Sequence, residues 1–175
     1  MGLAGEVVLL PDAGPLITLA YADSLDLLLV PGWAVALVDM VLHEVTRNQT
    51  PTSEKLANWA QSHKFPILQT GIFFRYQQAL VASDVAPRKS NLGEIAIQEV
   101  MGGFALNKPP KSGVFLFEDH KIARARFVVP DNCRKVSTRA FLLFLKQRAW
   151  ITSAAEIERK AIQAGRAFSS LRFPG

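Results

Sequence analysis

The sequence predicts a three-layer α/β/α fold around a central, mainly parallel sheet. Short apolar runs of strand length alternate with longer segments whose apolar residues have helical spacing, and no internal repeat or low-complexity tract interrupts them. The 175 residues, 49% hydrophobic and 20% charged, are enough to bury one core. Because parallel strands need crossover connections, the alternation favours a parallel sheet with helices on both faces.

The first half of the chain contains two long strand candidates. Residues 7–10 form an apolar, partly β-branched run typical of a buried strand, and a short helix begun by Asp12 or Ala13 follows. A second strand is expected at residues 33–40, leading into the segment 41–47. The other expected elements are helical turns at 25–30, a helix at 52–64 with Ser53 as its cap, a short strand at 65–68 and a helix at 73–85.

The second half continues the alternation. Residues 91–94 open a helix whose apolar positions extend to Met101, and the composition of residues 107–113 predicts a loop. The remaining expected elements are a strand at 114–117, a short helix ending at Arg126, a last strand between 127 and 136, and helices around 139–146 and 154–164.

Several classes of protein are disfavoured. A single cysteine, Cys133, cannot form an internal disulfide, which favours a reducing cytoplasm. The longest stretch without charged or strongly polar side chains, residues 27–38, is too short to cross a bilayer, so no membrane association is expected. No glycine-rich dinucleotide or triphosphate motif follows any strand.

The net charge of +5 is unevenly distributed. Residues 134–175 hold nine basic and two acidic side chains, a net charge of +7, and residues 1–133 hold 11 basic and 13 acidic ones, a net charge of −2. A basic surface of this kind can attract nucleic acid or an acidic protein. The alternative is a solvated basic helix face.

Acidic residues stand where the predicted strands give way to helices. Asp12 follows the first strand, Glu44 lies just past the second, and Glu118 and Asp119 follow a later one; Glu94, in the first turn of a helix, can face the same edge. Sites in parallel α/β sheets form at this edge. Converging carboxylates repel each other unless cations hold them, and hard oxygen ligands suit Mg²⁺ or Mn²⁺.

Each acid also has a structural interpretation. Asp12 and Asp119 can cap helices, Asn91 with Glu94 fits a variant of the capping box, and Glu44 can lie on a solvated helix face. A cap explains one acid at a time. It does not require that every strand-to-helix junction on one edge be acidic, so the joint pattern favours a site.

These residues resemble the PIN-domain family, in particular its toxin-like branch. The resemblance is carried, in the family's motif order, by the runs DAGPLITLAYADSLDLLL, HEV, NLGEIAI and FLFEDHKIARAR, and it covers roughly residues 6–148. It implies a nuclease domain over residues 1–150, followed by a basic helix and tail over 151–175 that packs on the domain or on a partner.

The resemblance also implies a metal-dependent ribonuclease site. Asp12, Glu44, Glu94 and Asp119 fall on the family's four acidic positions, and Asp12, Glu94 and Asp119, with Glu118 beside them, would hold Mg²⁺ or Mn²⁺. Ser137 and Thr138 fall near a hydroxyl-bearing turn that supports the ligands in some members. The expected partners are RNA as substrate and, as toxin, a separately encoded antitoxin that covers the site.

The sequence departs from the family pattern at three places. Ala13-Gly14 offers no side-chain donor after the first acid, Glu118 replaces a common Asp, and Ser137 replaces a glycine. A catalytically degenerate module that binds RNA or protein is therefore a second hypothesis. A phosphohydrolase with an Asp12 nucleophile is a third, although such enzymes usually carry another Asp where Gly14 stands.

Basic residues near the acids are candidates for contacts with RNA phosphates, and the apolar residues among them indicate packing on the core or on a second copy of the chain. The candidates are Arg124, Arg126, Arg134, Lys135 and Arg139. For Arg124 a structural ion pair is an equal alternative. His43 and His120 adjoin two of the acids, but sequence neighbours point to different faces, so neither is assigned an acid/base role.

Overall fold

Four parallel strands form the central sheet of the protein. The structure is a computed structural model that describes residues 5–83, 91–118 and 128–167. The strands β1 (Glu6–Pro11), β2 (Ala34–Val35), β5 (Lys111–Phe117) and β6 (Cys133–Ser137) lie in the order β2-β1-β5-β6. All three pairings are parallel. The prediction of a mainly parallel sheet is confirmed.

A second pair of strands, β3 (Leu37–Val38) and β4 (Ile67–Leu68), is also parallel. The expected single strand at 33–40 is wrong, because the chain changes sheets at Ala36. The N–H of Ala36 still donates to Leu9 of β1, at 3.2 Å, whereas the N–H of Leu37 donates to Pro66, which precedes β4, at 3.0 Å. The next helix then begins at Asp39, inside the range predicted as strand.

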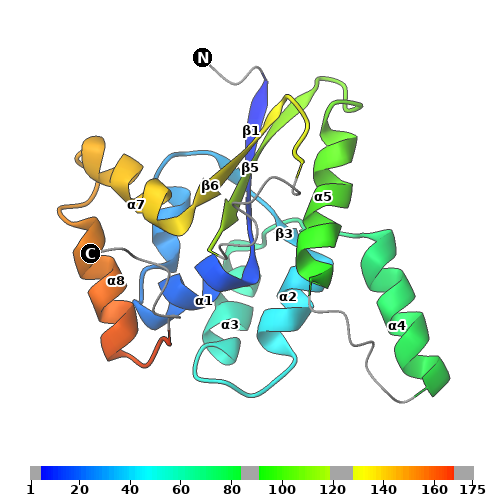
Figure 1. Cartoon of the computed structure of the whole chain (residues 1–175), viewed down its shortest axis with the longest axis horizontal. Helices are drawn as coiled ribbons and strands as arrows, with labels where there is room; N and C mark the ends of the chain where they lie inside the picture. The colour runs from blue at the N-terminus through cyan, green and yellow to red at the C-terminus, as the bar shows by residue number, and fades with distance from the viewer. Residues whose placement is uncertain (1–4, 84–90, 119–127, 168–175) are drawn as a thin grey trace.

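Helices flank the sheet on both sides, as the three-layer prediction requires (Figure 1). In Figure 1, α5 lies on one side, and α1, α7 and α8 lie on the other. α8 packs against α1 and α7. The helices are α1 (Ala13–Tyr21), the 3₁₀ turn η1 (Leu25–Leu29), α2 (Asp39–Thr46), α3 (Ser53–His63), α4 (Gly71–Ser83), α5 (Leu92–Phe104), α7 (Thr138–Gln147) and α8 (Ala154–Gln163).

The core is centred on β1 and β5. Leu9, Leu10, Phe115 and Leu116 are fully buried, as expected for the middle strands of a parallel sheet that is covered on both faces. This packing fixes the carboxyl ends of β1 and β5 relative to each other. The backbone N–H of Asp12 continues their pairing by donating to the carbonyl of Leu116 at 2.9 Å.

Other element boundaries differ modestly from the predictions. The strand expected at 114–117 begins earlier, at Lys111, because residues 111–113 pair with Glu6, Val7 and Val8 of β1. The cap of α3 is Thr52 rather than Ser53, whose hydroxyl instead accepts from the N–H of Thr50. The short helix expected to end at Arg126 lies outside the described residues.

Among residues 5–83, 91–118 and 128–167, none of the helices combines the length and the apolar composition that a membrane span requires.

Candidate functional site at the carboxyl edge of the sheet

Asp12 occupies the junction between β1 and α1. It is the N-cap residue of α1, with extended backbone angles (φ −78°, ψ 173°), and its side chain makes no capping hydrogen bond. The helix-capping interpretation of this carboxylate therefore lacks its defining contact. The first turn of α1 contains no acidic residue, and Asp12, directly before it, lies at the positive end of this helix dipole.

Glu118 follows β5 and lies against α1. The hydroxyl of Thr18 contacts both carboxylate oxygens, at 2.8 and 2.9 Å, and Nη2 of Arg166 lies 3.4 Å from Oε2. A Cβ at position 14 would lie only 2.9 Å from both Cβ and Oε2 of Glu118. Gly14 therefore makes room for a carboxylate that extends along α1 to Thr18.

This contact accounts for the residues at positions 14 and 118 together. The absence of a side chain at Gly14 is what lets the Glu118 side chain pass. Glu is one methylene longer than Asp, and this longer side chain contacts Thr18, one helical turn after Gly14. As a consequence, the Glu118 side chain is only 4% exposed and both of its oxygens already have partners. A cation at Glu118 would compete with Thr18 and Arg166.

Glu44 and the first turn of α5 form a second acidic contact. The N–H of Gly93 donates to Oε1 of Glu44 at 3.2 Å, and a Cβ at position 93 would lie 2.8 Å from Oε2. Burial raises the pKa of the Glu44 carboxyl, and the Gly93 hydrogen bond and Arg47 act in the opposite direction. Glu44 is therefore not on a solvated helix face.

Glu94 directly follows Gly93 in the first turn of α5. The carboxylate of Glu44 thus binds the residue next to Glu94, so the fold brings these two predicted acids to the same helix end. The side chain of Asn91, the N-cap residue, makes no capping hydrogen bond. The capping-box interpretation is therefore wrong for Asn91.

The described acids lie at two helix starts: Asp12 and Glu118 lie beside α1, and Glu44 and Glu94 lie at the start of α5. Helix α2 contacts both α1 and α5, and the starts of α1 and α5 lie at the same edge of the sheet (Figure 1). Asp119 lies outside the described residues. Within those residues, no group of three or more His, Cys, Asp or Glu side chains is placed to hold a metal ion.

Ser137 and Thr138, the predicted supporting hydroxyls, stand at the carboxyl end of β6. Ser137 caps α7 by accepting from the N–H of Ala140 at 3.1 Å, and the Thr138 hydroxyl donates to the carbonyl of Phe117 at 3.3 Å. Thr138 is buried and ties the start of α7 to the end of β5, directly before Glu118.

The predicted basic residues divide between the edge strand β6 and α7. Arg134 is exposed, and its guanidinium donates to the carbonyls of Asp131 and Cys133, both at 2.8 Å. Lys135 is half-buried in β6, and Arg139 is exposed in the first turn of α7. Arg124 and Arg126 lie outside the described residues.

His43 packs against aromatic rings. Its ring centroid lies 5.3 Å from that of Phe73 and 5.2 Å from that of Tyr76, at the contact between α2 and α4. Burial, followed by the charge of Arg47, lowers the pKa of His43. His43 therefore contributes to the packing between α2 and α4.

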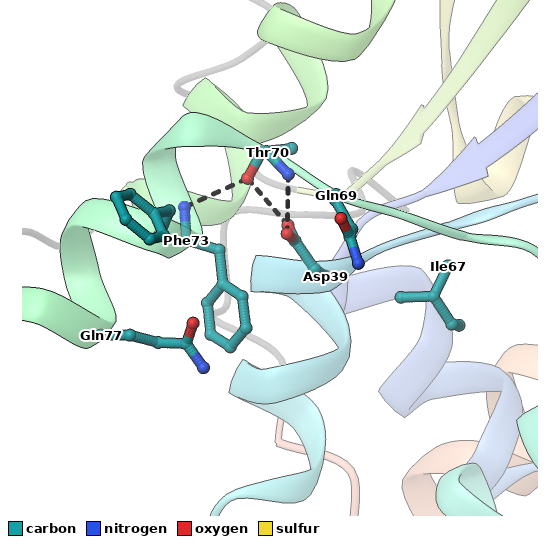
Figure 2. Close-up of a pocket in the computed structure, with 7 residues that line it drawn as sticks. Asp39, Ile67, Gln69, Thr70, Phe73 and Gln77 are labelled. Carbon is teal, nitrogen blue, oxygen red and sulfur yellow. Dashed lines mark hydrogen bonds between the residues drawn. The ribbon is translucent and has the colours of Figure 1, made fainter.

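The sequence analysis missed Asp39, although it satisfies the same criterion as the other acids. It stands where β3 gives way to α2, but it was included in the range predicted as strand. Figure 2 shows its carboxylate facing Thr70. Oδ1 accepts from the Thr70 hydroxyl at 2.8 Å and from the N–H of Met40 at 2.7 Å, and Oδ2 accepts from the N–H of Thr70 at 2.7 Å.

A pocket of about 460 Å³ opens beside this buried carboxylate (Figure 2). It is lined by Asp39, Ile67, Gln69, Thr70, Phe73, Phe74 and Gln77. The hydrogen bonds of Asp39 join the ends of β3 and β4 and hold the start of α4, which indicates a structural role. Asp12, Glu44 and Glu94 do not line this pocket.

The chain matches no family model, no curated protein and no solved structure. Its function is therefore inferred from the side chains and their placement.

Proposed function

We propose that this protein is a metal-dependent ribonuclease that hydrolyses RNA phosphodiester bonds and acts as the toxin of a toxin–antitoxin pair. The observation that supports it most directly is the arrangement of acids at the carboxyl edge of the sheet. Asp12 stands at the end of β1, directly before the first turn of α1, and Glu44 lies against the helix end that carries Glu94.

Asp12, Glu94 and Asp119 are the proposed ligands for Mg²⁺ or Mn²⁺, because carboxylate oxygens are the donors these ions prefer. When bound, such an ion lowers the pKa of a water and stabilises negative charge on a phosphate. Glu44 orients the start of α5 through Gly93 and thereby sets the position of Glu94. Glu118 was expected as a further ligand, but Thr18 and Arg166 hold its carboxylate. Its proposed role is to join the end of β5 to α1.

The proposed setting is the cytoplasm, with RNA as substrate and with an antitoxin and a second copy of the chain as protein partners. The predicted basic residues Arg134, Lys135 and Arg139 are proposed to contact RNA phosphates. Exposed Arg134 and Arg139 suit this role best, because a phosphate in solution can reach them.

The test is cleavage of a fluorescently labelled single-stranded RNA by the full chain in Mn²⁺, Mg²⁺ or EDTA. We expect cleavage only with metal, and losses on the order of 100-fold or more in Asp12→Asn and Glu94→Gln. Glu156→Gln changes an exposed acid of α8 and serves as the matched control, with an expected change below about twofold.

Circular dichroism confirms that each variant is folded. Metal-independent cleavage, or cleavage unchanged in both Asp12→Asn and Glu94→Gln, would refute the assignment. Binding of RNA without any cleavage would favour the degenerate binding module instead.

A further inference from the structure

Arg166 connects the C-terminal segment to the candidate site. Its Nε donates to the hydroxyl of Thr18 at 3.0 Å, and its Nη2 donates to Oε2 of Glu118 at 3.4 Å. Thr18 in turn contacts both oxygens of Glu118. A guanidinium from the C-terminal segment thus joins a hydroxyl of α1 and a carboxylate that follows β5.

The end of α8 is built to place this side chain. Gly165 has a φ of +114°, a left-handed conformation that L side chains rarely adopt. The N–H of Gly165 donates to Ile162 at 3.0 Å, and the N–H of Arg166 donates to Ala161 at 2.9 Å. These two bonds form a Schellman cap, which turns the chain sharply at the helix end. Arg166 is therefore directed back toward α1, on which α8 packs.

The ion pair leaves Arg166 nearer to solvent than its partner. The Arg166 side chain is 16% exposed, against 4% for Glu118. Their 3.4 Å separation is longer than the roughly 2.7–2.9 Å of a strong hydrogen bond between a cation and a carboxylate. The Thr18 hydroxyl is thus the nearer partner of the carboxylate, and the guanidinium is the more exposed member of the ion pair.

The surroundings also provide other charges. Glu158 of α8 has a pKa raised by burial, with Arg139 acting against that shift and Glu118 adding to it. Its Oε1 is buried and has no hydrogen-bond partner within the part of the chain that the structure describes. Glu118 therefore interacts with charges of both signs, the guanidinium of Arg166 and the carboxylate of Glu158.

We propose that Arg166 binds a phosphate oxygen of the RNA, with Thr18 and Glu118 orienting its guanidinium. This inference rests on the proposed ribonuclease function and adds to it a substrate-binding residue from the C-terminal segment. A guanidinium presents several N–H donors in a planar fork that matches the geometry of phosphate, which an ammonium does not. Fixing the guanidinium in advance reduces the entropy that binding costs.

The test is the affinity of the full chain for a labelled single-stranded RNA oligonucleotide in EDTA, measured by fluorescence anisotropy at several salt concentrations. For Arg166→Gln we expect about fivefold to tenfold weaker binding and a salt slope reduced by about 0.7, the value for one contact to a single strand. Arg166→Lys keeps the charge and recovers the salt slope, but only part of the affinity. Arg159→Gln removes an exposed arginine from α8, the helix that precedes Arg166, and is the matched control, with an expected change below about twofold.

Loss of Arg166 also leaves the buried Glu118 carboxylate without its cation, which can destabilise the fold. A second comparison therefore separates an effect on RNA binding from an effect on folding. Glu118→Gln and the double variant Glu118→Gln/Arg166→Gln lack that buried charge, and thermal unfolding shows whether both are folded. A lower RNA affinity in the double variant than in Glu118→Gln supports the proposal. Equal affinities, or a wild-type chain that does not bind the RNA, overturn it.

Cleavage of the same RNA in Mn²⁺ is scored separately. If the wild-type chain binds RNA more tightly than Arg166→Gln but does not cleave it, the ribonuclease proposal is refuted and the proposed phosphate contact is supported. If the wild-type chain cleaves the RNA and Arg166→Gln binds it as tightly as wild type, the ribonuclease proposal is supported and the proposed phosphate contact is refuted.

Discussion

Replacement of Gly93 by alanine tests the contact between Glu44 and α5. The added Cβ would lie 2.8 Å from Oε2 of Glu44 and 3.2 Å from Cγ2 of Val41. The first distance is too short for a real contact, so the carboxylate has to move. That movement breaks the hydrogen bond from the Gly93 N–H to Oε1, which is 3.2 Å long.

Two opposing terms determine the magnitude. A hydrogen bond to a charged group contributes about 1.5–3 kcal/mol to the free energy of unfolding. Replacement of a glycine by alanine inside a helix raises the free energy of unfolding by about 1 kcal/mol. We therefore expect Gly93→Ala to lower the free energy of unfolding by about 1 kcal/mol. Displacement of Glu44 is also expected to reduce any metal-dependent cleavage.

Gly102 provides the matched control, because it lies in the same helix and a Cβ there would meet nothing within 4 Å. Gly102→Ala is expected to raise the free energy of unfolding by about 0.5–1 kcal/mol. Urea unfolding followed by circular dichroism measures both variants, and the midpoints of thermal unfolding should differ by roughly 4–8 °C. Equal stabilisation of the protein by the two alanines would refute the proposed contact.

Two further predictions concern Glu44 and Thr70. Because burial raises the pKa of Glu44, the folded chain binds its proton more tightly than the unfolded chain. Its contribution to stability is complete below the ordinary value of 4.5 and is lost as the pH rises through the folded-state pKa, so the stability of wild type relative to Glu44→Gln falls over that window. Urea unfolding at a series of pH values measures this difference, and a constant difference would contradict the pKa shift. Thr70→Val removes the hydroxyl that donates to Asp39 and accepts from the N–H of Phe73, and it is expected to cost about 1–3 kcal/mol in thermal unfolding. Thr70→Ser retains the hydroxyl and should recover most of that loss; if both variants lose stability equally, the hydroxyl is not responsible.

The central strands could be predicted from sequence because their environment has a simple pattern. β1 and β5 are buried on both faces, so residues 7–10 and 114–117 are continuous apolar runs. The start of α1 after Asp12 and the start of α5 at Leu92 followed from local helix signals. The same local patterns placed Asp12 at the end of β1 and Glu94 in the first turn of α5, as the structure has them.

The division of residues 33–40 could not be read in the same way. β2 and β3 have two residues each, and the change of sheet occurs at Ala36, whose own side chain gives no indication of it. Strands this short have no periodicity. The resulting error hid Asp39, because an acid at position 39 marks a helix start only if the strand is known to end at Val38.

The pairing of Arg166 was also beyond a local reading. The residue lies 148 positions from Thr18 and 48 from Glu118, and only the packing of α8 on α1 brings them together. One part was readable, since a glycine just after a helix predicts a left-handed cap, and Gly165 follows the helix that was expected at 154–164. The direction that this cap gives Arg166 depends on where α8 docks.

The placement of Arg166 changes how the basic excess of residues 134–175 can act. A net charge of +7 spread over a solvated surface attracts RNA through its overall field, and in that case every arginine of the segment contributes about equally. A guanidinium that is fixed by a hydroxyl and a carboxylate acts through its position instead. The two models differ in the comparison of Arg166→Gln with Arg159→Gln, which remove the same charge from the end and the middle of one segment. Equal losses of RNA affinity would indicate attraction by the field alone, and a larger loss at Arg166 would indicate a defined contact.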